Sequence, residues 1–270
     1  MTRYVDHLAD AWTECWSTDD DGPAFGRIYA RDIVWWDVAR GRGAEQTGHD
    51  GLTRARAEVR ARAPRVRVFV ERLVAGDPWV AVEFVAITPE VGGRVGVPGC
   101  AWWRVDDDGR IVREHWYWDW SLRRPVTNDL AGHAVAGGGE ARDPRWYRTF
   151  VAELMGTWDG DPPIMVDAFY APDVVFDTMG AGPELVIRGA DALRAAERRL
   201  AEQLVERSTK VGEVVGMGPV VAFTHLTEAR TEGGTRRTTP AARVLTLGED
   251  DRVVGDHTYL LRAWPARGSR

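Results

Sequence analysis

The chain has 270 residues, a formal net charge of −6 and two cysteines. This length suffices for two domains that each bury a core of their own. The acidic balance argues against nucleic acid as a partner, because binding to nucleic acid depends mainly on the neutralisation of phosphates by basic side chains.

The positions of the cysteines and the lengths of the apolar segments argue against further classes of protein. Cys15 and Cys100 lie far apart and are not flanked by other metal ligands, so neither a disulfide framework nor a zinc site is predicted. No N-terminal apolar run suggests a secretory signal, and no segment approaches the ~20 apolar residues of a membrane span. We therefore expect a soluble, cytoplasmic protein without a membrane partner.

The first half of the chain predicts helices followed by antiparallel strands. Hydrophobic spacing predicts a helix over 3–18, a short helix over 25–29 and a strand at 32–37. An arginine-rich helix is expected over 53–63, ended by Pro64. Strand-like runs then follow at 65–75, 79–88, 97–105 and 111–120, and the turn at 106–109 joins the last two.

The strand at 111–120 alternates between two chemically different faces. His115, Tyr117 and Asp119 share one face, and Glu114 shares the other face with three tryptophans. Neighbours on one face of a strand are about 7 Å apart. His115, Tyr117 and Asp119 can give or take protons, so this row predicts an acid/base site for one small molecule.

The second half repeats the series after a linker-like segment. Residues 129–145 have the composition of a linker and include three consecutive glycines. The landmarks of the first half recur 140 to 142 residues downstream, among them His257 and Tyr259 as counterparts of His115 and Tyr117. A steady period across several landmarks predicts a duplicated domain. We expect units at 1–126 and 145–270, joined by a linker at 127–144.

The order of elements predicts the fold class. Helices come first in each unit and a meander of long strands follows, which favours an α+β fold in which a curved sheet wraps around the N-terminal helices. The expected architecture is two tandem cone-shaped α+β barrels, each enclosing a cavity.

Three motifs of the first unit carry a resemblance to a known family. They are Y-A-x-D-x-V-x-x-D from Tyr29, G-x-D from Gly48 and D-D-G-R-I-V-R-E-H-W from Asp107. With the preceding helix they resemble the SnoaL-like branch of the nuclear-transport-factor-two-like superfamily, and the resemblance covers both halves. It implies the cone fold, no cofactor, no metal, a small apolar or polycyclic substrate and an internal pseudo-dimer of the two units. Pairing of whole chains into a homodimer stays open.

The resemblance also implies positions for functional residues. The superfamily hosts ring closure, isomerisation, epoxide opening, dehydration and pure binding on one fold. Asp37 matches the catalytic carboxylate of ketosteroid isomerases and polyether cyclases, and His115 falls on the strand where SnoaL-like cyclases place acid/base residues. Trp12 and Ala101 stand where the isomerase has its oxyanion-hole tyrosine and aspartate, which argues against a steroid isomerase.

The spacing of the aspartates favours the first unit as the catalytic one. Asp37 is eight residues beyond Tyr29, whereas Asp177 is seven beyond Tyr170, and a slip of one residue turns a strand side chain to the opposite face. Leu261 also replaces the aspartate that the first unit has at 119. We therefore expect a catalytic first unit and a mainly structural second unit, whose remaining candidates are Asp177, His225, His257 and Tyr259.

Tryptophan is concentrated in the same unit. Ten of the thirteen tryptophans precede residue 121, and indole walls suit a flat polycyclic or polyene substrate. The candidates for substrate binding are Trp12, Trp16, Trp35 and Trp103. The alternative is that these rings fill the core or the contact between the units.

With these residues, the SnoaL-like resemblance implies a cofactor-free, acid/base-catalysed cyclase that closes a ring in an apolar, polyketide-like substrate. Asp37 or Asp119 would remove a proton next to a carbonyl, while His115 or Tyr117 stabilises the enolate oxygen. A non-catalytic carrier of an apolar ligand is one alternative. The residues also have structural interpretations: Asp37 as the cap of a turn, and His115 with Tyr117 as a polar pair on the outer face of the sheet.

Epoxide hydrolysis or epoxide-opening cyclisation is the other alternative. The same aspartate would then activate water or an internal hydroxyl while a protonated acid assists the epoxide oxygen. Polyether cyclases carry a second carboxylate about one helix after the first. Glu58, Glu71 and Glu197 are the nearby candidates here, and none stands at the matching position.

Overall fold

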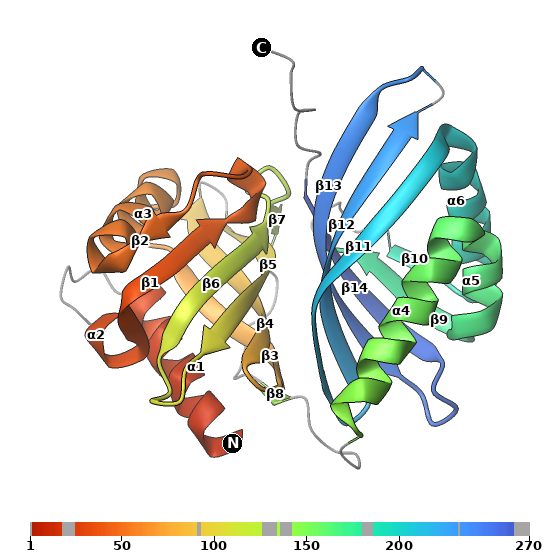
Figure 1. Cartoon of the computed structure of the whole chain (residues 1–270). Helices are drawn as coiled ribbons and strands as arrows, with labels where there is room; N and C mark the ends of the chain where they lie inside the picture. Colours follow the sequence, from red (N-terminus) through yellow and green to blue (C-terminus); the bar gives the residue numbers. More distant parts are fainter. Residues whose placement is uncertain are drawn as a thin grey trace. The chain divides into compact units, whose positions relative to one another are not determined.

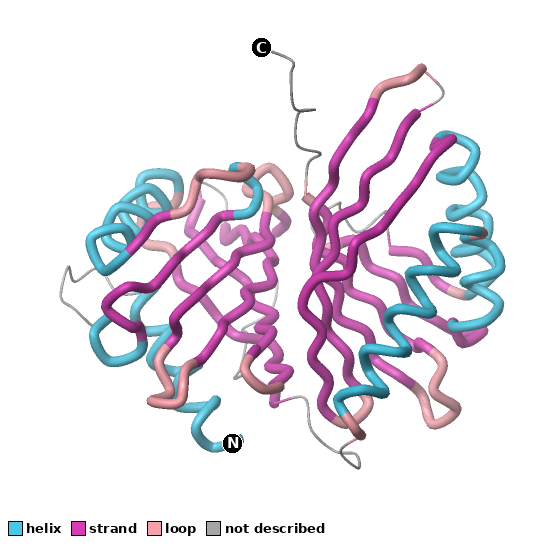
Figure 2. Tube along the Cα trace, in the orientation of Figure 1, coloured by secondary structure: helices cyan, strands magenta, loops and turns pink. Residues whose placement is uncertain are grey.

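The computed structural model describes residues 2–17, 25–90, 93–125, 134–135, 142–179, 186–231 and 233–261. It contains two compact units, Met1–Ala136 and Gly137–Arg270, and the division falls inside the predicted linker. Each unit combines helices with one sheet (Figure 2), so the predicted tandem α+β fold is confirmed. Within the described ranges, no helix is long and apolar enough to cross a membrane.

The first unit has the strand order β2-β1-β6-β5-β4-β3-β8, with β7 paired to β5. β1 runs parallel to β6, whereas β6, β5, β4 and β3 form an antiparallel meander. The helices (Figure 1) are α1 (Thr2–Ser17), α2 (Phe25–Ile28) and α3 (Gly48–Arg62), with a 3-10 turn, η1, at Val38–Arg40. The strands are β1 (Tyr29–Asp37), β2 (Gln46–Thr47), β3 (Arg67–Ala75), β4 (Trp79–Glu90), β5 (Gly93–Val105), β6 (Ile111–Trp118), β7 (Arg124–Pro125) and β8 (Ala134–Val135).

Helix α1 closes one face of this sheet. Val5, Leu8, Trp12 and Trp16 recur at helical spacing, and all four side chains are buried. This stripe covers the inner face of the sheet, which we define as the face toward α1. Side chains on the inner face of the first unit are therefore enclosed between the sheet and α1.

The second unit repeats the arrangement with the strand order β10-β9-β14-β13-β12-β11. Its helices α4 (Pro144–Gly160), α5 (Pro162–Phe169) and α6 (Ala190–Gln203) lie on one face of the sheet (Figure 1), which is the inner face of this unit. Leu154 of α4, Val166 of α5 and Leu193 of α6 join Phe223 in its core. The strands are β9 (Tyr170–Thr178), β10 (Val186–Arg188), β11 (Leu204–Met217), β12 (Val220–Thr231), β13 (Arg236–Leu247) and β14 (Val253–Leu260).

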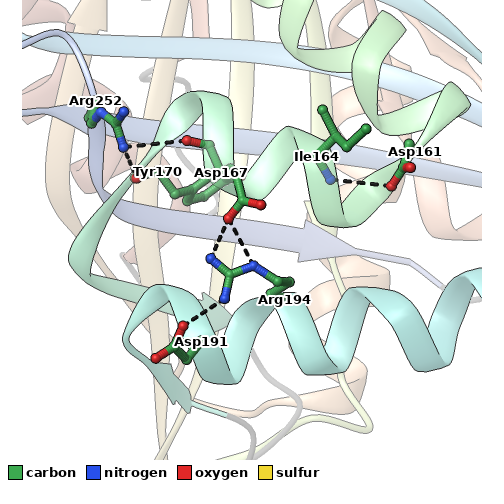
Figure 3. Close-up of polar contacts among 7 residues, drawn as sticks. All are labelled: Asp161, Ile164, Asp167, Tyr170, Asp191, Arg194 and Arg252. Carbon is green, nitrogen blue, oxygen red and sulfur yellow. Dashed lines mark hydrogen bonds and ion pairs between the residues drawn. The ribbon is translucent and has the colours of Figure 1, made fainter.

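Polar contacts hold α5 at the start of β9 (Figure 3). Asp161 caps α5 by accepting a hydrogen bond from the backbone N–H of Ile164 at 3.2 Å. Arg194 of α6 pairs with Asp167 of α5. Arg252 donates to the carbonyl oxygens of Asp167, at 3.4 Å, and Tyr170, at 3.2 Å. These contacts fix the backbone at Tyr170, whose side chain enters the chamber described below.

Candidate functional site

The structure corrects the predicted acid/base row of the first unit. Glu114 lies on the inner face of β6, where it accepts a hydrogen bond from Trp12 of α1. His115 and Tyr117 therefore lie on the opposite, outer face. The His115 ring lies 5.3 Å from that of Trp36 and 5.7 Å from that of Trp79, and burial lowers the pKa of His115 to about 4.

Asp119 does not join this row either. β6 ends at Trp118, so Asp119 lies in the turn that follows, where alternation between two faces no longer applies. Its Oδ1 accepts hydrogen bonds from the backbone N–H of Ser121, at 2.8 Å, and from the Ser121 hydroxyl, at 2.7 Å. The three predicted residues are thus not brought together around the chamber of the first unit.

A different carboxylate, Glu114, occupies that chamber. It is fully buried, and its Oε1 accepts hydrogen bonds from the indoles of Trp12 and Trp116, each at 2.6 Å, and of Trp103, at 3.2 Å. Its Oε2 accepts a hydrogen bond from the hydroxyl of Tyr29 at 2.6 Å. Burial raises the pKa of Glu114 to about 7, although all four hydrogen bonds act in the opposite direction.

The sequence contained a signal for Glu114 that the acid/base interpretation missed. Glu114 alternates with Trp116, Trp118 and Trp120. The more apolar face of a strand normally packs on the core, so the tryptophan face was the better choice for the inner face.

The four predicted substrate-binding tryptophans do lie inside the first unit. Trp12, Trp16, Trp35 and Trp103 are each at most 1% exposed. Their rings pack on one another: the centroids of Trp12 and Trp103 are 5.3 Å apart, and those of Trp16 and Trp35 are 5.9 Å apart. These contacts agree with the alternative in which the four rings fill the core. A role in substrate binding stays a prediction.

Asp37 lies on the inner face at the end of β1 and is 4% exposed. It caps η1 by accepting a hydrogen bond from the backbone N–H of Ala39 at 3.2 Å, as the structural interpretation of this residue expected. Its Oδ2 lies 3.6 Å from Nε of Arg40, and Arg40 also pairs with Glu58 of α3. Burial raises the pKa of Asp37 to about 6, against the opposing effects of Arg40 and Trp118.

Arg40 therefore connects two carboxylates that the sequence did not place together. The side chains of Arg40 and Glu58 are 26% and 43% exposed, so solvent reaches both of them. The structure thus brings together a buried carboxylate, an arginine and a more exposed carboxylate, which are groups that acid/base chemistry uses.

The register of the second unit places Asp177 away from the inner face. Asp256 pairs with Phe176, and His257 pairs with Asp177, in the parallel ladder between β14 and β9. Asp256 lies inside, hydrogen-bonded to Tyr170, so Asp177 and His257 share the outer face, as the one-residue slip predicted. Tyr259 is two residues beyond His257 on the same strand and lies on that face as well.

Asp256 is the counterpart of Glu114, 142 residues downstream. It is fully buried, forms an ion pair with Arg243 and accepts a hydrogen bond from the hydroxyl of Tyr170 at 2.7 Å. Burial alone lowers the pKa of Arg243, but Asp256 more than offsets this effect, so the pKa lies above its ordinary value. No sequence pattern had singled out Arg243 or Asp256.

His225 is the only second-unit candidate of the four that lies on the inner face. Its ring centroid is 5.8 Å from that of Phe223 in the core and 6.3 Å from that of Trp158 on α4. Burial lowers the pKa of His225 to about 3. Trp158 also donates a hydrogen bond to Glu197 of α6 at 2.9 Å, and burial raises the pKa of Glu197. The second unit, which the sequence predicted to be mainly structural, thus contains buried polar side chains on its inner face.

Metal ligands do not gather in the part of the chain that the structure describes: it contains no group of three histidine, cysteine, aspartate or glutamate side chains that could hold an ion.

Comparisons with known proteins show to which family the chain belongs. The SnoaL-like domain model matches residues 9–114 and again residues 145–255. No curated protein matches the chain at a significant level.

Similar solved structures each cover less than half of this chain. A putative SnoaL-like polyketide cyclase from Jannaschia sp. is 16% identical, with 45% of this chain and 91% of that chain covered and a TM-score of 0.39. An epoxide hydrolase from M. tuberculosis that is described as LEH-like is 18% identical, with 42% and 81% covered and a TM-score of 0.37. SalBIII, an epoxide hydrolase/cyclase-like enzyme of pyran ring formation in salinomycin, is 14% identical, with 46% and 97% covered and a TM-score of 0.38. Because the domain model matches both units over most of their length, the chain belongs to the SnoaL-like domain family.

Proposed function

We propose that this protein is a cofactor-independent enzyme that catalyses acid/base ring closure of an apolar, polyketide-like substrate, with Asp37 as the base. The observation that carries the proposal is the environment of Asp37: a buried carboxylate whose pKa burial raises to about 6, beside Arg40, whose side chain is 26% exposed. Such a carboxylate is ionised at neutral pH and basic enough to take a proton from a carbon next to a carbonyl.

Arg40 takes the role that the sequence had suggested for His115 or Tyr117. Its guanidinium lies 3.6 Å from Asp37 and can hold the enolate oxygen that forms when the proton leaves. The proposal therefore rests on Asp37 and Arg40 and assigns no proton transfer to His115, Tyr117 or Asp119.

The test compares Asp37→Asn with Asp177→Asn, the matched substitution on the outer face of the second unit. A poly-β-ketone methyl ester serves as the probe, and cyclised product is measured by liquid chromatography and mass spectrometry. We expect Asp37→Asn to lower kcat by about 10²-fold or more with little change in KM, and Asp177→Asn to match the wild type. Full turnover by Asp37→Asn would exclude Asp37 as the base.

The pH profile of the same reaction provides an independent check. The base must be ionised, so kcat/KM of the wild type should rise as the pH passes through about 6, the pKa of Asp37, and then level off. A profile that is flat across this range would contradict the proposal.

Epoxide opening is the second candidate, and Glu58 is the observation that favours it. Arg40 contacts both Asp37 and Glu58, which supplies the second carboxylate that this reaction needs. Glu58→Gln should abolish opening of an epoxide with an internal hydroxyl, because the reaction then lacks its second carboxylate, and should leave ring closure of the β-ketone probe unchanged. If the variant opens the epoxide at the wild-type rate, Glu58 has no part in the reaction.

A further inference from the structure

The second unit contains a polar chamber that the proposed function does not use. Trp158 of α4 connects its members. The guanidinium carbon of Arg207 lies 4.1 Å from the centroid of the Trp158 ring, and the His225 ring centroid lies 6.3 Å from it. The same indole donates a hydrogen bond to Glu197 at 2.9 Å. A cation, an imidazole and a carboxylate thus contact one aromatic ring.

Arg207 has fewer acceptors than a buried guanidinium requires. Its side chain is 5% exposed, and Nε lies 3.6 Å from Oδ1 of Asp159. The Asp159 oxygens already accept hydrogen bonds from the backbone N–H and the hydroxyl of Thr209, each at 2.7 Å. Nη2 donates to the carbonyl of Trp158, but neither Nε nor Nη1 has a hydrogen-bond partner among the described residues. Burial lowers the pKa of Arg207, and an added anion would offset that cost.

His225 supplies a second unsatisfied atom. The residue is 7% exposed, and its Nδ1 lies 3.2 Å from the Thr227 hydroxyl. Its Nε2 has no hydrogen-bond partner within the described part of the chain. Because burial lowers the pKa of His225 to about 3, the ring is neutral at pH 7. Of these two residues only Arg207 carries a charge, which suits a singly charged ligand better than a dianion.

Arg207 also lines a cavity at the ends of three strands. A cavity of about 490 Å³ is lined there by the ends of β11, β12 and β13, including Arg207, Arg230, Arg236, Arg237, Glu206 and Glu228. The ladder register places Arg237 on the same face of the sheet as Arg207 and His225, whereas Arg230, which pairs with Glu206 at 2.6 Å, lies on the opposite face. This volume is within the range of small-molecule sites.

The aromatic walls of the second chamber are accessible, unlike those of the first. Trp158 and Phe176 are half-buried, whereas the residues at the equivalent positions of the first unit, Trp16 and Trp35, are each 1% exposed. An apolar ligand body can therefore contact Trp158 in the second unit where the first unit has packed rings.

We infer that the second unit binds a carboxylate-bearing small molecule, with the carboxylate on Arg207, an apolar body along Trp158, and His225 Nε2 as a second hydrogen-bonding partner. Because Nη1 of Arg207 has no hydrogen-bond partner among the described residues, it can donate a charge-assisted hydrogen bond to a carboxylate oxygen. This site is separate from Asp37 and makes the second unit a binding unit.

The test uses 4-phenylbutyrate as the probe, 4-phenylbutanamide as its neutral analogue and inorganic phosphate as the competing anion. Isothermal titration calorimetry of the full chain should show saturable binding of the acid at least tenfold tighter than that of the amide, and weaker binding of phosphate. Arg207→Gln should remove the preference for the acid, and Arg207→Lys should restore part of it. Lys210→Gln, which removes a 73% exposed cation of the same strand, should behave as the wild type.

A second measurement needs no substitution at Arg207. In protein labelled with ¹⁵N-histidine, the acid should shift the ring Nε2 resonance of His225, which His225→Asn identifies among the six histidines. The inference would be overturned if the acid and the amide bound with equal affinity, or if phosphate bound more tightly than the acid. It would also be overturned if Arg207→Gln kept the preference for the acid, or if only other histidines responded.

Discussion

At the scale of single residues, the two repeats satisfy the same buried carboxylate in different ways. Glu114 accepts hydrogen bonds from three indoles and a phenol. Asp256, at the equivalent position, is paired with Arg243. The first unit has Ala101 where the second has Arg243. Small, uncharged Ala101 leaves room for rings, so the first chamber is filled by indoles and the second is charged.

The pKa of Glu114 predicts a pH dependence of stability. It is raised from its ordinary value of 4.5 to about 7, so the folded chain holds this proton more tightly than the unfolded chain. The stabilisation that this bound proton gives the folded chain is fully present below about pH 4.5 and is lost as the pH rises through about 7. We expect the free energy of unfolding of the wild type to fall by on the order of 1–3 kcal/mol across this window, as measured by chemical denaturation at several pH values.

Glu114→Gln is the matched control for this prediction. The amide keeps one oxygen for the indoles and can donate to Tyr29, so we expect the variant to fold and to show a smaller decrease between pH 6 and 7. Equal decreases in both proteins would show that Glu114 does not titrate in this window.

A second prediction concerns the ion pair of the second chamber. Asp256→Asn removes the negative charge beside Arg243, which is 5% exposed. We expect a loss of about 3–5 kcal/mol in the free energy of unfolding, because a buried guanidinium is left without its anion. In a double-mutant cycle by denaturant unfolding, Arg243→Met with Asp256→Asn should cost less than the sum of the single changes. Additive losses would contradict a direct coupling.

At the scale of elements, β6 shows what alternation can and cannot determine. The pattern at 111–120 correctly separated Glu114 from His115 and Tyr117, because successive strand residues point to opposite faces. It could not decide which face meets α1, since that depends on the helix that packs there. It also extended the strand to Asp119, where a turn begins. The candidate site was therefore assigned to the wrong face of a correctly predicted strand.

The face on which a strand residue lies was predictable where the residues could be counted from a tyrosine that both units share. The one-residue difference in spacing between Tyr29 and Asp37 and between Tyr170 and Asp177 turned Asp177 to the outer face. Arg40, by contrast, could not be placed beside Glu58 from the sequence, because the contact joins η1 to α3.

The packing of α4 on β11 gives a prediction at this scale. A Cβ at Gly216 would lie 2.3 Å from the ring of Tyr147, so the helix must move to accommodate it. We expect Gly216→Ala to lower the free energy of unfolding by about 1–3 kcal/mol. Gly156→Ala is the control: nothing lies within 4 Å of its Cβ, and alanine in a helix should raise stability by about 0.5–1 kcal/mol. Thermal denaturation distinguishes the two, and an unchanged Tm for Gly216→Ala would show that Tyr147 moves aside freely.

At the scale of the whole molecule, the duplication was readable because it depends on many residues at once. A period that recurs across helices, strands and turns survives local changes, whereas the content of each chamber depends on a few substitutions such as Ala101 for Arg243. The sequence therefore predicted the tandem α+β fold but not the division of the two chambers into one filled by indoles and one charged.

Each unit has its own sheet and core, which predicts independent folding. Fragments 1–136 and 137–270, which correspond to the two compact units, should each show far-ultraviolet circular dichroism of a mixed α/β protein and a cooperative thermal transition. A fragment that remains unfolded on its own would show that its core depends on the other unit.

The indoles around Glu114 have an optical consequence. Ten of the thirteen tryptophans belong to the first unit, and three of them donate directly to one carboxylate that titrates near neutral pH. Excited indoles respond to the charge of their hydrogen-bond partners, so intrinsic fluorescence reports mainly on this unit and changes as Glu114 ionises. The protein thus carries an intrinsic emission probe for the ionisation of Glu114.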